Sequence, residues 1–337
     1  MACYPRSVFR TKHIMSPAWL RACALGGVLA LVACQRRQPN PFEHSGRYTH
    51  VAVGDGSTCV TDGAGDVTCW GNHRPKHASE LPAGPYTQLS VGSYSHCGLR
   101  TDGTLACAGR PGGAARTAVP APIAPPGTFV ALAGQCGLRH DGSVACATGR
   151  SASTRLAAAS IPPGPFTRIA VGAFGGCGVT RSGELNCWGV LSPNTTAACR
   201  TGLKMVDLTP PANIQGEVID VAMGAVHSCA LLRTGQVRCW GDDACGQLAA
   251  PPSAMGQLAS HPTANRTCGL TTLGAIECWG EALTPTPAPT GSFASLSVGR
   301  AHACALRPGG DVVCWGQNAQ DQVAGNRSRL GTYLFHN

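Results

Sequence analysis

The chain has 337 residues, of which 43% are hydrophobic, 13% charged and 5% aromatic, and its formal net charge at pH 7 is +9. Residues 1–33 hold four of the 26 basic side chains and no acidic ones, so the rest has 26 − 4 = 22 basic against 17 acidic side chains, or +5. No Lys/Arg block concentrates this small excess, which disfavours a nucleic-acid partner. The 19 cysteines disfavour a reducing, cytosolic compartment.

The N-terminus predicts export. Four basic side chains precede an apolar run at residues 24–33, which is the order of a secretory signal and too short to span a bilayer. The run ends in Leu31-Val-Ala-Cys34, which resembles the lipobox of bacterial lipoproteins. The resemblance implies a signal peptide over residues 1–33 and lipidation of Cys34, with the outer membrane favoured because Gln35 follows. An ordinary signal peptide with a chance cysteine is the alternative.

Residues 34–45 are expected to form a short tether, and residues 46–337 a single all-β domain built from an internal repeat. Seven times two cysteines stand ten residues apart, with a glycine six positions after the first. The first cysteines follow one another at intervals of 38, 39, 41, 52, 39 and 36 residues, and periods near 40–45 are typical of propeller blades. The pairs are Cys59–Cys69, Cys97–Cys107, Cys136–Cys146, Cys177–Cys187, Cys229–Cys239, Cys268–Cys278 and Cys304–Cys314.

Each unit reads as a β-hairpin. Between Cys97 and Cys107, apolar and polar residues alternate on both sides of a turn that contains Gly103. Cys97 should therefore face Cys107 across the two strands, where Cα atoms lie about 4.5–5.5 Å apart and a disulfide can form. A second strand precedes each hairpin, and proline clusters between units are expected to connect blades.

Cross-strand disulfides are one of three interpretations of these fourteen cysteines. They could instead be free, buried core residues, whereas zinc is disfavoured because a hairpin offers only two thiolates. Two further cysteines, Cys199 and Cys245, follow neighbouring Cys-Trp-Gly sequences, and we predict an eighth bridge between them. The first and last units look ordinary, which favours a closed ring over an open solenoid with capping repeats, and residues 323–335 are a candidate closing strand.

The most regular units carry a family resemblance. Residues 221–231, continuing to Val237-Arg-Cys-Trp-Gly241 and Gly246-Gln-Leu248, resemble the regulator-of-chromosome-condensation repeat, and residues 298–318 match it again. Units two and three lack the tryptophan yet keep both cysteines. The resemblance implies a seven-bladed β-propeller. The family includes a nuclear nucleotide-exchange factor, whose partner an exported chain would not meet, and secreted propellers that inhibit β-lactamases by protein contact.

No residues predict catalysis or a bound metal or cofactor. His96, His227 and His302 each stand just before a repeat cysteine, and we interpret their recurrence at one blade position as structural hydrogen bonding. His73 and His77 lie in a Pro/Lys loop with no helix to align them as metal ligands. The chain shows no sialidase Asp-box, nucleophile elbow, phosphate loop or paired-carboxylate motif.

We therefore expect a non-enzymatic, exported, lipid-anchored and monomeric propeller that acts as a protein-binding or scaffold module of the cell envelope. The expected partner is an unidentified protein held by the blade-connecting loops, with residues 191–216 as the widest departure from the repeat. The membrane is expected to be reached through the lipid alone. A carbohydrate-binding or hydrolytic envelope propeller and a purely architectural envelope protein are the alternatives.

Overall fold

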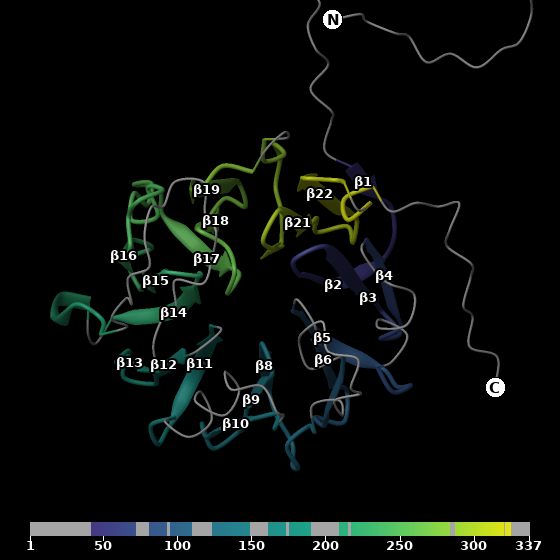
Figure 1. Ribbon diagram of the computed structural model, residues 1–337, viewed down its shortest axis with the longest axis horizontal. Helices are drawn as coiled ribbons and strands as arrows, with labels where there is room; N and C mark the ends of the chain where they lie inside the picture. The colour runs from purple at the N-terminus through teal and green to yellow at the C-terminus, as the bar shows by residue number, and fades with distance from the viewer. Residues whose placement is uncertain are drawn as a thin grey trace, which may run out of the picture. The chain divides into compact units, whose positions relative to one another are not determined.

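Seven antiparallel sheets stand around a common centre, as Figure 1 shows. The computed structural model describes residues 42–71, 81–92, 95–109, 123–148, 161–172, 175–189, 209–214, 217–283, 287–319 and 321–324. All of these belong to the unit Pro39–Asn337. One 3-10 turn, Ala212–Ile214, accompanies the strands, and no helix among the described residues is long and apolar enough to cross a membrane.

Each sheet is one blade whose strands follow the chain order from the centre outward. Blades one to four are β2 (Tyr48–Val53), β3 (Ser57–Asp62) and β4 (Val67–Gly71); β5 (Tyr86–Val91), β6 (Ser95–Arg100) and β7 (Leu105–Gly109); β8 (Ala131–Ala133), β9 (Cys136–Leu138) and β10 (Val144–Cys146); β11 (Phe166–Val171), β12 (Gly175–Thr180) and β13 (Leu185–Gly189). Blades five to seven are β14 (Val218–Met223), β15 (His227–Leu232) and β16 (Val237–Gly241); β17 (Met255–Ser260), β18 (Arg266–Thr271) and β19 (Ile276–Gly280); β20 (Ser295–Val298), β21 (His302–Leu306) and β22 (Val312–Gly316). The first strands contact one another around the ring, and β20 closes it against β2.

The first strand of five blades contains a β-bulge between its first and third residues. A bulge re-aims the side chain next to it. The third side chain consequently reaches the following blade: Gln88 accepts from the Leu132 backbone N–H at 2.9 Å, and His50 bonds to the Leu89 carbonyl at 3.1 Å. Inner strands are thus tied to one another by side chains as well as by apolar packing.

The repeat glycines join consecutive blades. All seven lie in hairpin turns with φ between 81° and 94°, a region that glycine enters without steric cost. The carbonyl of each glycine accepts a hydrogen bond from a backbone N–H at or just before the first strand of the next blade. Gly65 accepts from Tyr86 at 3.0 Å, and Gly310 accepts from Tyr48 at 3.0 Å, which continues the same link across the closure.

The closing strand comes from the N-terminal side of the propeller. Phe42–His44 form β1, which pairs antiparallel with β22 and gives blade seven a fourth strand (Figure 1). These residues belong to the propeller and not to the tether expected over residues 34–45. Residues 323–335 were the sequence-based candidate, but Val323 lies in a turn and residues 325–337 lie outside the described residues.

Specific contacts hold β1 in place. Glu43 pairs with Arg307 at 3.0 Å, and His44 bonds to the Val323 carbonyl at 2.7 Å while its ring stacks on Trp70 with centroids 4.5 Å apart. Because Trp70 belongs to blade one, β1 fastens blade seven to blade one. The three-residue sequence Phe-Glu-His is too short to show the alternation of a strand, so the sequence did not predict β1.

We expect Gly310→Ala to lower the free energy of unfolding by about 1–3 kcal/mol, because φ is +94° and a Cβ would lie 2.9 Å from the Arg47 Cα. Gly309→Ala is the matched control, since a Cβ there has nothing within 4 Å. Denaturant unfolding of the disulfide-intact variants measures both. Equal losses at the two positions would contradict the role assigned to the Gly310 turn.

Candidate functional site

The seven predicted cysteine pairs are disulfide-bonded, one across the second and third strands of each blade. The strand register places the partners directly opposite, as for Cys97 and Cys107. The free-core and zinc interpretations are therefore wrong for these residues. Cys245 is also disulfide-bonded, while its predicted partner Cys199 and the predicted lipid site Cys34 lie outside the described residues.

The tryptophan after the second cysteine is packed between blades. The five such side chains have exposed fractions of 1–7%, and each lies against the core of the preceding blade: Trp70, Trp188, Trp240, Trp279 and Trp315. They cannot form an exposed platform for sugar rings. This removes the aromatic side chains that the carbohydrate-binding alternative would most easily use.

The histidines before the repeat cysteines occupy two different positions. His227 and His302 stand two residues before the cysteine, and each bonds through Nε2 at 2.8 Å to a threonine of the next blade, Thr267 and Thr58. His96 stands one residue before its cysteine, at the position that Thr58 holds in blade one. The expectation of one shared position was thus wrong for His96, although all three are buried.

His302 is held as a single neutral tautomer. Thr58 donates its hydroxyl proton to the Gln322 carbonyl at 2.9 Å, so His302 Nε2–H must donate to Thr58 Oγ1. Its Nδ1 is buried and has no hydrogen-bond partner within the described part of the chain. Burial, with a smaller contribution from the nearby His261, lowers the pKa of His302 to about 3, while Asp55 opposes the shift.

A polar cluster lies where the inner strands converge. The loop from β17 to β18 has two residues more than the loops of blades one, five and seven. Its side chains bond to residues of blades one and two. Thr263 donates to Asp55 Oδ1 at 2.5 Å, and His261 Nδ1 lies 2.9 Å from Thr263 Oγ1 and 3.5 Å from Asp55 Oδ1. We call Asp55, His261 and Thr263 the axial cluster.

Burial is the main influence on the pKa of His261 in the axial cluster. It lowers the pKa of His261, while Asp55 and a hydrogen bond to the Val91 backbone act in the opposite direction and Arg300 adds to the lowering. Thr263 directs its proton to the carboxylate, so it is not poised as a nucleophile with His261 as its base. The three residues therefore tie blade six to blades one and two.

Sequence reasoning missed the axial cluster, although one signal for it exists. The inner strand ends six residues before the repeat cysteine in blades one, two, four, five and seven, but eight residues before Cys268 in blade six. That two-residue excess is the insertion that carries Thr263. The sequence does not show which residue the insertion contacts, because Asp55 lies 208 residues away from Thr263.

Thr263→Val should cost about 1–3 kcal/mol of unfolding free energy, because it removes the proton that Thr263 donates to the Asp55 carboxylate. Thr263→Ser keeps the hydroxyl and should cost under about 1 kcal/mol, mainly for the lost methyl group. Thermal or denaturant unfolding at neutral pH compares the two. A serine variant as unstable as the valine variant would show that the methyl group, and not the hydrogen bond, matters.

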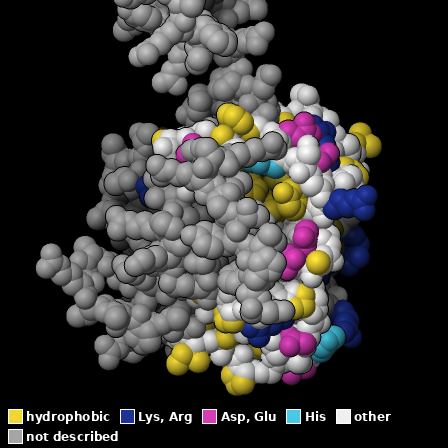
Figure 2. Space-filling model, turned by 90° about the vertical axis from the view of Figure 1, so that its right-hand side faces the viewer, with side chains coloured by type: hydrophobic (Ala, Val, Ile, Leu, Met, Phe, Trp, Pro, Cys, Tyr) yellow, Lys and Arg dark blue, Asp and Glu magenta, His cyan; other side chains and the backbone are white. Residues whose placement is uncertain are grey.

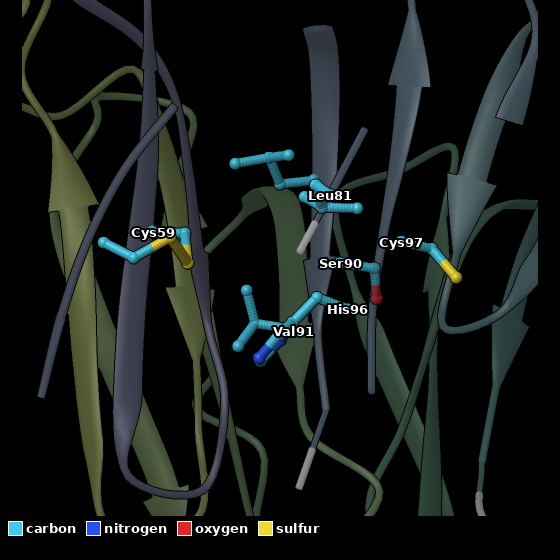
Figure 3. A pocket seen from close by; sticks show the side chains of 8 residues that line it. Cys59, Leu81, Ser90, Val91, His96 and Cys97 are labelled. Carbon is cyan, nitrogen blue, oxygen red and sulfur yellow. A yellow bond between two sulfur atoms is a disulfide. The ribbon is translucent and has the colours of Figure 1, made fainter. Parts of the chain in front are cut away.

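A small pocket lies between blades one and two, but it offers no ligand site. Figure 3 shows its lining, which includes Cys59, Leu81, Val91 and His96. It has no room for a water molecule. The described residues also contain no group of three or more His, Cys, Asp or Glu side chains that could hold a metal ion.

The visible surface is mixed in charge. In Figure 2 both basic and acidic side chains appear on the coloured part of the visible face. Over the described residues, ten arginines and no lysines stand against fifteen acidic side chains, so their net charge is 10 − 15 = −5. This distribution gives no basic footprint for nucleic acid on the described surface.

The comparisons with known proteins agree with the fold. The family model of the Regulator of chromosome condensation (RCC1) repeat matches residues 218–247 and 293–322, within blades five and seven. The receptor kinase CR4 ectodomain of Physcomitrella patens is similar with a TM-score of 0.57 and 22% identity, over 82% of this chain and 74% of that one. The CRINKLY WD40 ectodomain of the Arabidopsis thaliana receptor kinase ACR4 gives 0.56 and 21%, over 82% and 97%.

Proposed function

Because the chain is a seven-bladed propeller of RCC1 repeats, we propose that it is a non-catalytic protein-binding or scaffold module, exported and anchored to the cell envelope through Cys34. One observation carries the binding role. The conspicuous side chains of the described part are used to hold the ring together: disulfides within blades, tryptophans between blades, and histidines bonded to threonines. Such a rigid ring is a scaffold on which variable connections can carry recognition.

The cysteines and the similar structures support the exported setting. Seven bridges in one chain need an oxidising compartment to form and persist. The two similar structures are ectodomains of receptor kinases, which are by name the outward-facing parts of those proteins. A propeller exposed outside the cytosol has this structural precedent.

The proposed partner site is the connection between blades four and five, which is the longest in the repeat. Residues 190–208 and 215–216 of it lie outside the described residues. The described end is part of the scaffold, because Ile214 is buried in the cluster formed by blades four and five. A test of the connection must therefore spare residues 209–217.

Affinity capture with chemical cross-linking tests the partner site. We expect the full chain to capture an envelope protein that is lost when residues 190–208 are replaced by a short Gly/Ser linker. Because that replacement removes Cys199, the Cys199→Ser/Cys245→Ser double variant is the matched control and should keep the partner. Equal capture by all three proteins would contradict a site on this connection.

A separate measurement tests the anchor. Mass analysis of the N-terminal peptide and detergent-phase partitioning should show a lipidated cysteine in the exported protein, and Cys34→Ser should abolish both signals. A mature N-terminus at another residue, with no lipid, would leave an exported propeller but remove the membrane attachment.

A further inference from the structure

The seven disulfides differ in their access to solvent. The first cysteine of every pair is buried, whereas the outer-strand cysteine is half-buried in most blades. Cys278 of blade six is exposed, and no other disulfide cysteine among the described residues is. Its counterpart in blade seven, Cys314, is fully buried.

The difference follows from what covers the outermost strand. In blade seven, β1 lies along β22 and places Phe42 opposite Cys314. In blade six the chain leaves β19 through Glu281 and a proline-rich connection, and no strand forms among its described residues, 281–283 and 287–292. The outer edge of β19 therefore remains open at Cys278.

The other half of this bond is deeply buried. Cys268 has an exposed fraction of 0% and packs with Leu296 and Trp315 in the cluster between blades six and seven. An external thiolate can thus approach only one of the two sulfurs. The neighbouring pairs Thr267↔Trp279 and Gly269↔Glu277 hold the two strands together on either side of the bond.

We propose that the Cys268–Cys278 bond is a thiol–disulfide exchange site for an external thiol, either a small molecule or a cysteine of a protein. The external thiolate attacks Cys278 Sγ and forms a new S–S bond, while the Cys268–Cys278 bond breaks. Its electron pair leaves on Cys268 Sγ, which takes up a proton. Full reduction requires a second external thiol that attacks the external sulfur of the mixed disulfide and releases Cys278 as a thiol, so the two external thiols together supply the two electrons and leave as their own disulfide.

The surroundings make the exchange reversible. Burial in an apolar cluster raises the cost of a Cys268 thiolate, so the released group is held as a thiol. The paired strands keep it opposite Cys278, where Cys268 Sγ loses its proton, attacks Cys278 Sγ, expels the external group as a thiolate and restores the bond. The remaining staples lie in other blades and take no part in this exchange.

A pair of single variants tests the asymmetry, because each breaks the same bond. Cys268→Ser leaves Cys278 as a free thiol, which should react with an aromatic disulfide reagent within about tenfold of the rate of a free cysteine. Cys278→Ser leaves the buried Cys268, which should react at least ~100-fold more slowly. Cys304→Ser and Cys314→Ser are the controls and should both react slowly, because both residues of that pair are buried. Equal rates for the two blade-six variants would overturn the proposal.

The unmodified protein gives the second test. The protein is incubated with reduced glutathione in one arm and with a reduced thioredoxin in the other. The mixed disulfides that form are trapped by acid or alkylation and mapped by mass spectrometry. We expect the first adduct at Cys278 with the other staples intact. Adducts in both arms assign the site to thiols in general, and an adduct with glutathione alone restricts it to small thiols. A first adduct at another staple, or none in either arm, would overturn the assignment.

Discussion

Trp315→Ala should lower the free energy of unfolding of the propeller by about 3–5 kcal/mol, the largest loss we expect from any single side chain. The side chain is 1% exposed and packs against Cys268, Leu270 and Phe293, so its removal leaves a cavity between blades six and seven. Because neighbouring blades share this contact, the loss should lower the midpoint of the whole unfolding transition. Denaturant unfolding with the disulfides intact measures it.

The chain itself contains the comparison. Blade two has Ala108 where blade seven has Trp315, and Ala108 is still buried at 3% exposure, so that interface has been packed without an indole. Leu273→Ala, at a turn residue that is 86% exposed, should change stability by less than about 0.5 kcal/mol. A Trp315 variant no less stable than this control would mean that the interface between blades six and seven collapses around the gap.

Acidification should destabilise the propeller by about 4 kcal/mol between neutral pH and pH 5, from His227 and His302 alone. Burial lowers the pKa of His227 to about 4, against smaller opposing effects of Asp242 and Asp243, and lowers that of His302 to about 3. Below pH 6.5 these two histidines bind protons in the unfolded chain but stay neutral in the folded chain, so the free energy of unfolding falls as the pH falls. At pH 5, which is 1.5 units below the unfolded value, each histidine contributes about 2 kcal/mol of loss.

Unfolding midpoints at about pH 7.5 and pH 5 test this linkage. The His227→Gln/His302→Gln variant keeps an N–H that can reach the threonine hydroxyls but cannot titrate, so its stability should vary less with pH than that of the parent. Burial also lowers the pKa of His50, which adds to the loss in both proteins. A parent and variant with the same pH dependence would show that these two histidines do not govern acid stability.

The sequence predicted the features that are local or repeated. The symmetry of Cys97 and Cys107 about one turn predicted both the hairpin and the bond, because ten residues of chain contain all the information. The fold followed, since seven such units at regular intervals allow few other arrangements.

What the sequence did not predict depends on residues far apart in the chain. Strand β1 is a strand only because β22 offers it an edge, and three residues are too few to show alternation. The axial cluster joins Asp55 to Thr263 across the ring, and no spacing rule connects them. The position of His96 was misread because one residue of offset in a short strand exchanges the two faces of the sheet.

The pairing of β1 with β22 also predicts an order of events in folding. Each staple spans ten residues and can form as soon as its own hairpin does, whereas Phe42 and its partner Cys314 lie 272 residues apart. Contacts between such distant residues form late, because the intervening chain must first be ordered. We therefore expect the earliest strand of the propeller to pair late, after blades one to six have formed.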